Sequence, residues 1–369
     1  MKNLQTAIPA SDRITSVDFF RGLTMFLLIG ESTGMFHYFS EINFGVAKFI
    51  GTQLTHHEWH GLYFWDLIQP FFMFIVGVAI PFAVANRLKK GATNKSLYLH
   101  ALKRSALLFF LGLALYTSGE DKIVFRLQNV LAQLSVTYLV AFLIFRWKWF
   151  YQLALSLVLL LVADLAYRFF PVAGFNQPWE PFQNLGSWVN NWLENTDKAS
   201  IWASLNAVST TAHTIWGVLC GKILMESKSA AEKIKLLVIA GVAALVVGFG
   251  IDLLSITPII KKIATASFVF ASGGWAILAL TLSYWMIDIK KWAAGTQAFI
   301  VVGMNCIFIY LVFSLGGADI LARLYKPFIT AFLGWTGHIF TGMLISGAVW
   351  FSLWYVTYWM YQRKIFIKI

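Results

Sequence analysis

A short run of titratable side chains stands directly before a long apolar stretch, where such residues are rare. It contains His56, His57, Glu58 and His60, and Asp66 follows near the start of the apolar segment. Titratable groups at the mouth of a membrane helix are costly to place and are functional candidates by default. The alternative is an interfacial loop that lies among lipid headgroups. These residues by themselves fit a functional site and an interfacial loop equally well.

Metal binding is one chemistry that a histidine cluster suggests. The zinc-protease pattern His-Glu-x-x-His places both histidines on one helix face. The run from His57 to His60 is one residue short of that pattern. His56 and His60 are four residues apart and would share a helix face. No third ligand is evident in the sequence, so we expect no metal here.

The elements that must position these residues are membrane helices. Of the 369 residues, 59% are hydrophobic and only 12% are charged, whereas soluble domains carry about 25% charged residues. The apolar runs are continuous over roughly 20 residues, which favours helices over the alternating strands of an outer-membrane barrel. A lipid-facing chain must satisfy its backbone hydrogen bonds internally. We therefore predict an all-α polytopic membrane bundle, with residues 1–369 forming a single domain.

We expect about ten membrane spans, with boundaries uncertain by a few residues. Their residue ranges are 17–37, 62–86, 100–117, 128–146, 149–169, 203–225, 234–254, 265–287, 296–315 and 339–361. A shorter mixed segment, 319–335, is interpreted as a re-entrant or interfacial helix, with an eleventh span as the alternative.

The distribution of Lys and Arg predicts the orientation. With the N-terminus inside, the inside segments hold about twice as many of these residues as the outside segments, as the positive-inside rule requires. This predicts that both termini are inside and that the loop 38–61, with the histidine cluster, is outside. It also explains the net charge of +12 without nucleic-acid binding. The other long outside loop, 170–202, is rich in Trp, Asn and Gln, which suits a sugar-binding surface or an ordinary interfacial loop.

Further polar residues lie within the predicted spans. Asp18 and Arg21 are three residues apart on the first span and can pair. Glu31 is expected in the outer half of the bilayer, where it must face a cavity, be paired or be protonated. It therefore lies on the same predicted side as His56 and Asp66, and the sequence leaves open whether the three converge.

Later spans carry isolated polar residues. Arg104 begins the third span at the predicted cytosolic face, as an anchor or as a ligand-binding group. His213, Asp252 and Asn305 are single polar residues in later spans. For each of these three, the simpler hypothesis is a polar side chain that is satisfied inside the bundle.

Two blocks resemble the signatures of a known family. The first follows the pattern Arg-x-x-Ser-Leu/Val-Asp-x-Phe-Arg-Gly, which this chain meets at Arg13, Ser16, Val17, Asp18, Phe20, Arg21 and Gly22. The second follows His-x-x-Trp-x-Gly-Leu-x-x-x-Asp-Leu-x-x-Pro-x-Phe-x-Phe-x-x-Gly, which it meets at His56, Trp59, Gly61, Leu62, Asp66, Leu67, Pro70, Phe72, Phe74 and Gly77. These blocks resemble the heparan-α-glucosaminide N-acetyltransferase family and its bacterial relatives. Weaker matches follow in GVLCGKIL and GMNCIFIY.

The resemblance implies an acyltransferase of the bacterial inner membrane. It would move an acetyl group from cytosolic acetyl-CoA to an amine or hydroxyl of a sugar or glycan on the external side. By motif, His56 corresponds to the active-site histidine of the family and Asp66 to its aspartate. His56 is expected to act as a general base or as a transient acyl carrier, with Asp66 orienting its ring.

The same resemblance suggests residues that hold the two substrates. Arg21 and Arg104 are expected near the phosphates of acetyl-CoA. Glu31, Trp59 and Asn305 are expected near the acceptor.

The chain also departs from the family pattern. Asn is usual where this chain has Glu31 or Ser32, Gln-Arg is usual where it has Ala132-Gln133, and animal enzymes carry a histidine at the position of Phe313. The alternative function is a glycan or glycan-precursor transporter, although such proteins tend to show internal repeats that this sequence lacks. The acceptor, the acyl chain and the oligomeric state, a homodimer included, are left open.

Overall fold

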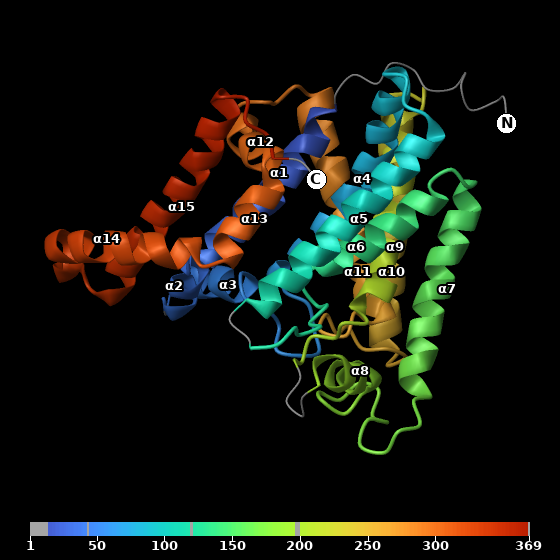
Figure 1. Cartoon of the computed structure of the whole chain (residues 1–369), viewed down its shortest axis with the longest axis horizontal. Coiled ribbons are helices and arrows are strands. Elements are labelled where there is room, and N and C mark those ends of the chain that lie inside the picture. Colours follow the sequence, from blue (N-terminus) through green and yellow to red (C-terminus); the bar gives the residue numbers. More distant parts are fainter. Residues whose placement is uncertain (1–13, 43, 119–120, 196–199, 368–369) are drawn as a thin grey trace. The chain divides into compact units, whose positions relative to one another are not determined.

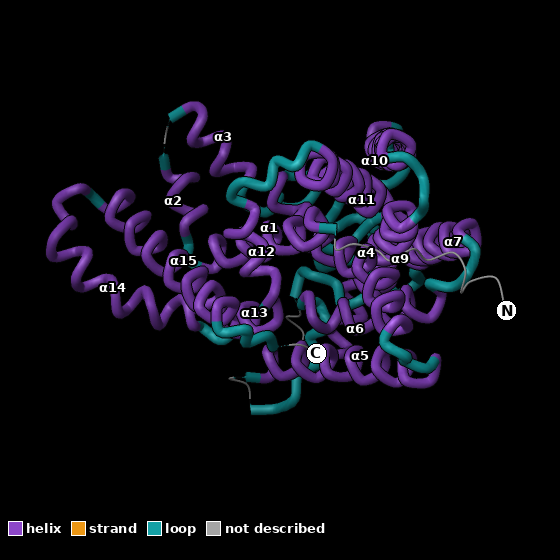
Figure 2. Tube along the Cα trace, turned by 90° about the horizontal axis from the view of Figure 1, so that it is seen from above, coloured by secondary structure: helices purple, strands orange, loops and turns teal. Residues whose placement is uncertain are grey.

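The computed structural model describes residues 14–42, 44–118, 121–195 and 200–367. Arg13 of the first motif lies outside the described residues. Within these ranges the regular elements are all helical, and the only β-type pairing is an isolated bridge between His60 and Ile260. The prediction of an all-α protein is confirmed (Figures 1 and 2).

The helices group into two compact units, which we describe separately. Unit 1 contains Glu58–Leu62 and Gln69–Trp285, and unit 2 contains Thr15–His57, Tyr63–Ile68 and Met286–Ile369. The chain passes from unit 2 to unit 1 after His57 and returns after Leu62, so the histidine cluster is divided between the units.

Unit 1 is built mainly from long helices that run alongside one another, whereas the short α8 (Leu185–Glu194) is seen nearly end-on (Figure 1). The long helices are α4 (Ile68–Lys89), α5 (Asn94–Thr117), α6 (Val130–Ile144), α7 (Trp149–Arg168), α9 (Asn206–Met225), α10 (Ala230–Leu253) and α11 (Ala266–Ser283). Helix α9 packs against α6, α7 and α11, while α10 packs against α11. Glycines allow α4 to approach α9 closely, because a Cβ atom at Gly77 would lie 2.0 Å from the Thr214 carbonyl oxygen.

Unit 2 combines the first helices with the C-terminal ones. They are α1 (Thr15–Ser32), α2 (Met35–Glu41), α3 (Gly45–Gln53), the short η1 (Phe64–Leu67), α12 (Thr296–Met304), α13 (Cys306–Ser314), α14 (Gly317–Leu333), η3 (Gly334–Thr336) and α15 (His338–Gln362). Helix α1 packs on α12, where a Cβ atom at Gly22 would lie 2.0 Å from the Phe299 carbonyl oxygen. Asp288 caps α1 by accepting from the backbone N–H groups of Thr15 and Ser16 at 3.0 and 3.1 Å.

Six helices in the described residues are long and apolar enough to cross a membrane. They are Phe64–Lys89, Asn94–Thr117, Trp149–Arg168, Ala230–Leu253, Ala266–Ile289 and His338–Gln362. Helices α12 and α13 would form a seventh as one broken span, bent by 76°. The other predicted spans are occupied by α1, α6 and α9, which do not meet that test; α6, for example, has only 15 residues. Ten spans and the orientation remain predictions.

Two segments expected to be outside loops contain helices. Loop 38–61 includes α3 and the end of α2, and loop 170–202 includes α8. Helix α8 begins because the Asn184 side chain accepts from the Ser187 N–H at 3.1 Å. The mixed segment 319–335 lies mostly in α14, which contacts α15 through a 2.7 Å hydrogen bond between the Tyr325 and Ser352 hydroxyls.

Candidate active site

Asp66 is the fixed point of the histidine-containing loop. It lies in η1, the single turn that leads into α4, and its side chain is 1% exposed. One carboxylate oxygen, Oδ2, accepts from the backbone N–H groups of Tyr63 at 2.9 Å and His57 at 3.2 Å. The other, Oδ1, lies 2.9 Å from Nδ1 of His56. Donors on both oxygens compensate the burial of the carboxylate, so its position is well defined.

His56 presents a partly exposed ring beside this buried carboxylate. Its side chain is 40% exposed, and the ring lies 6.5 Å from that of Trp65 between centroids. A carboxylate that accepts from Nδ1 favours the tautomer with its proton there, which leaves the lone pair on Nε2. This is the arrangement of a histidine general base with an orienting aspartate. His56 and Asp66 both belong to unit 2.

The neighbouring histidines have different surroundings. The His57 ring packs on Tyr63, with centroids 4.6 Å apart. His60 places Nε2 at 2.7 Å from Oδ1 of Asp252, at the end of α10. Asp252 is thus satisfied inside its unit, although by a residue of the histidine cluster. No spacing in the sequence predicts this pair, because its members are 192 residues apart.

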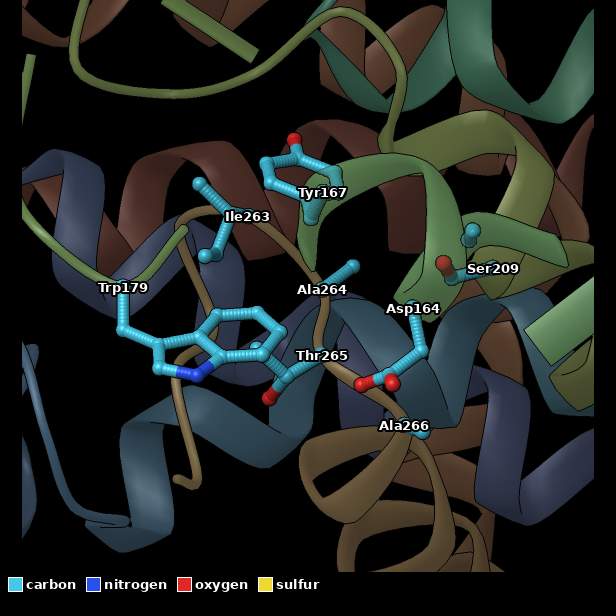
Figure 3. A pocket seen from close by; sticks show the side chains of 9 residues that line it. Asp164, Tyr167, Trp179, Ser209, Ile263, Ala264, Thr265 and Ala266 are labelled. Carbon is cyan, nitrogen blue, oxygen red and sulfur yellow. The ribbon is translucent and has the colours of Figure 1, made fainter. Parts of the chain in front are cut away.

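Trp59 is held firmly within unit 1. Its indole N–H donates to the Trp179 carbonyl at 2.7 Å, and its ring packs against a cluster that includes Tyr167 and Ile260. A pocket beside Trp179 is lined by unit 1 residues alone. Figure 3 shows the Asp164 carboxylate pointing toward Trp179 inside it.

The two arginines expected near acetyl-CoA lie in different units. In unit 2, Arg21 donates to Asp18 at 2.9 Å, so the predicted pairing of these two residues is confirmed. In unit 1, the Arg104 guanidinium lies over the Tyr138 ring, 4.5 Å from its centroid. In both arginines Nε is buried and has no hydrogen-bond acceptor among the described residues. A buried donor of this kind calls for a partner such as water or a ligand.

Two residues expected near the acceptor lie in unit 2. Glu31 is exposed in the last turn of α1. Asn305 is fully buried at the break between α12 and α13. Its amide donates to the Ile365 carbonyl at 3.1 Å and accepts from the Ile367 N–H at 2.9 Å. The Asn305 side chain therefore holds the C-terminal segment.

No group of three or more His, Cys, Asp or Glu residues in the described part of the chain could hold a metal ion. Neither Cys220 nor Cys306 forms a disulfide among the described residues, and the Cys306 thiol donates to the Gly303 carbonyl at 2.8 Å.

Comparison with known proteins identifies the family of this chain. The family described as heparan-alpha-glucosaminide N-acetyltransferase, catalytic, matches residues 13–250. The chain belongs to this family. Both motif blocks fall within the matched range, so the resemblance inferred from them is confirmed. Together with the apolar helices, family membership indicates an integral membrane protein.

Two mammalian members of the heparan-alpha-glucosaminide N-acetyltransferase family show how far this chain has diverged in sequence. The mouse protein of that name is 24% identical over 437 residues, an alignment that covers 99% of this chain and 62% of the mouse protein. The human protein is 32% identical over 135 residues, covering 35% of this chain and 18% of the human protein. The chain therefore spans less than two thirds of the length of these relatives. The family takes its name from an N-acetyltransferase activity.

Proposed function

We propose that this protein transfers an acetyl group from acetyl-CoA to an amine or hydroxyl of a sugar or glycan. The observation that carries the proposal is the 2.9 Å contact between His56 and the buried Asp66. Within a family named for acetyl transfer to a glucosaminide, this pair has the geometry of a general base and its orienting carboxylate.

The reaction follows from that pair. The acceptor nitrogen or oxygen attacks the thioester carbonyl carbon while Nε2 of His56 takes its proton. The carbon–sulfur bond then breaks, and the CoA thiolate leaves and receives the proton from the imidazolium. Asp66 favours the imidazolium through the hydrogen bond at Nδ1. In the alternative sequence, Nε2 attacks the thioester, the carbon–sulfur bond breaks and the CoA thiolate leaves. The acceptor then takes the acetyl group from Nε2, and its proton goes to the released thiolate.

Arg21 and Arg104 are proposed to bind the phosphates of acetyl-CoA. Each carries a buried Nε–H that lacks an acceptor within the described residues. Phosphate oxygens are strong acceptors for guanidinium groups. Replacing either arginine with methionine should raise the KM for acetyl-CoA at least tenfold and leave folding unchanged; measuring KM and melting temperature together checks this.

The acceptor site is proposed to include Glu31, whose exposed carboxylate suits a sugar hydroxyl or amine. Trp59 and Asn305 are assigned to the same site as residues that fix its surrounding segments.

The proposed orientation places loop 38–61 outside and residues 86–99 on the cytosolic side of a bacterial inner membrane. A homodimer remains a prediction. Labelling of Lys48→Cys and Lys90→Cys tests the orientation, in a background where both native cysteines are replaced by serine. An impermeant reagent applied outside should modify position 48 only. Modification of position 48 only from the cytosol would overturn the external acceptor.

The decisive experiment measures transfer of labelled acetyl from acetyl-CoA to a glycan extract by purified protein. Wild type should transfer, His56→Ala should not, and acetyl-CoA should raise the melting temperature of both. A protein that neither transfers acetyl nor gains stability from acetyl-CoA would instead favour the glycan transporter.

A further inference from the structure

The loop between His56 and Asp66 is held at its two ends by a single carboxylate. Asp66 accepts from the N–H of His57 before the loop and from the N–H of Tyr63 after it. The intervening segment, Glu58–Leu62, belongs to unit 1, whereas both ends belong to unit 2. Whatever holds this segment therefore acts on His56 through only one intervening residue of the chain.

The middle of the segment is held by the end of α10 and by the connection from α10 to α11. His60 Nε2 lies 2.7 Å from Asp252 Oδ1, and Gly61 N–H donates to the Ile259 carbonyl at 2.9 Å. Asp252 Oδ1 also accepts from the Ile259 N–H at 2.8 Å. The Asp252 carboxylate therefore contacts His60 directly and also fixes Ile259, whose carbonyl accepts from Gly61. Gly61 has φ of 145°, a backbone conformation that favours glycine.

The start of the segment is held as well. The Lys262 ammonium donates to the Glu58 carbonyl, and the Trp59 indole donates to Trp179 at 2.7 Å. Consecutive residues from Glu58 to Gly61 therefore each have a partner elsewhere in unit 1. Such an arrangement fixes the register of a loop better than a single contact does.

The His60–Asp252 pair is poorly suited to a role in overall stability. The side chains are 56% and 20% exposed, and exposed ion pairs contribute little to stability. The reaction rate, in contrast, depends strongly on the position of the reacting group, since a displacement of about 1 Å can lower the rate about 10²-fold. The pair is therefore better suited to fixing the position of a loop than to stabilising the fold.

We propose that His60 and Asp252 are positioning residues, which hold Glu58–Leu62 in register and thereby set the place of His56. They do this without touching the reacting atoms. The proposal rests on the proposed function, because it assigns these two residues to the same acetyl transfer.

The test compares kcat and KM for acetyl-CoA in His60→Ala, His60→Gln and Asp252→Asn. His60→Ala should lower kcat about tenfold, a fraction of what a full 1 Å displacement costs, with KM unchanged. His60→Gln keeps a side-chain N–H near the position of Nε2 and should recover most of that loss. Combining His60→Ala with Asp252→Asn should lower kcat no further than His60→Ala alone, because the contact between the two side chains is already lost in the single variant.

His37→Ala is the matched control. On α2, Nε2 of His37 lies 3.0 Å from Oε1 of Glu41, and the His37 side chain is exposed. His37→Ala therefore removes an ion pair comparable to His60–Asp252. This variant should retain wild-type kcat. Equal kcat in His60→Ala and His37→Ala would overturn the proposal.

Hydrogen exchange separates the proposal from the proposed function. Amides of residues 58–62 should exchange faster in His60→Ala than in wild type or in His37→Ala. Unchanged exchange would overturn the clamp itself, and faster exchange with unchanged kcat would overturn its positioning role. Wild-type protein that transfers no acetyl group would overturn the proposed function, and the positioning role with it, whatever the exchange shows.

Discussion

Two histidine–aspartate pairs begin four residues apart in this chain, and their surroundings differ. In His56–Asp66 the contact uses Nδ1, at 2.9 Å, and the aspartate side chain is 1% exposed. In His60–Asp252 it uses Nε2, at 2.7 Å, and the aspartate side chain is 20% exposed. The members of the first pair are ten residues apart in the sequence, and those of the second pair are 192 residues apart.

These differences correspond to two roles: Asp66 is suited to orienting a general base, and Asp252 is suited to holding a loop in place. A buried carboxylate fixed by backbone N–H groups presents one oxygen to Nδ1 and leaves proton chemistry to Nε2. A more exposed carboxylate that joins distant segments fixes where the chain runs. The same two residue types therefore serve chemistry at one site and placement at the other.

The largest expected effect comes from His56→Ala. Loss of a general base lowers the rate by about 10²–10⁴, while binding of acetyl-CoA should be unchanged because the proposed phosphate contacts are elsewhere. Transfer of labelled acetyl and the melting-temperature shift with acetyl-CoA measure the two quantities. Transfer at the wild-type rate would remove His56 from the mechanism.

Asp66 should be next, and two substitutions divide its roles. Asp66→Asn keeps an oxygen for the loop N–H groups but loses the charge that favours the imidazolium, so kcat should fall nearly as far as in His56→Ala. Asp66→Ala also orphans the N–H groups of His57 and Tyr63, which costs about 1–3 kcal/mol for each buried donor. Its melting temperature should lie below that of Asp66→Asn; equal melting temperatures would contradict the anchoring role.

A smaller effect is expected for Trp59→Phe. Phenylalanine retains the packing against Tyr167 and Ile260 but loses the hydrogen bond to Trp179, at a cost of about 1 kcal/mol. Thermal unfolding should register that loss, with the KM for the acceptor unchanged. A raised acceptor KM without loss of stability would show that the indole contacts the sugar directly.

His57→Ala should have the smallest effect. The group that binds Asp66 is the backbone N–H of His57, which alanine retains. The His57 ring packs on Tyr63 and is not part of that hydrogen bond. Activity should stay within about twofold of wild type, as for other substitutions away from critical contacts. A loss as large as that of His56→Ala would show that the two histidines act together.

Much of the fold follows from the sequence, because membrane helices are specified locally. Apolar runs of about 20 residues predict helices, and helices stand at each of the expected segments. The sequence did not predict α8 within its outside loop, since its start depends on a single capping contact of Asn184. Motif residues Gly22 and Gly77 could be recognised from sequence, but only the packed helices show that each permits a close backbone approach.

The sequence by itself determined the family and the helical class, and the resemblance to that family pointed to His56 and Asp66 as site residues. The structure then showed that Nδ1 of His56 lies 2.9 Å from Oδ1 of Asp66. Only the tertiary structure decided that Asp252 holds His60, that Trp59 is anchored to Trp179 and that Asn305 binds the C-terminal segment. These contacts join residues 60 to 192 positions apart. Local propensity and spacing carry no signal for them, because they exist only after distant helices have packed.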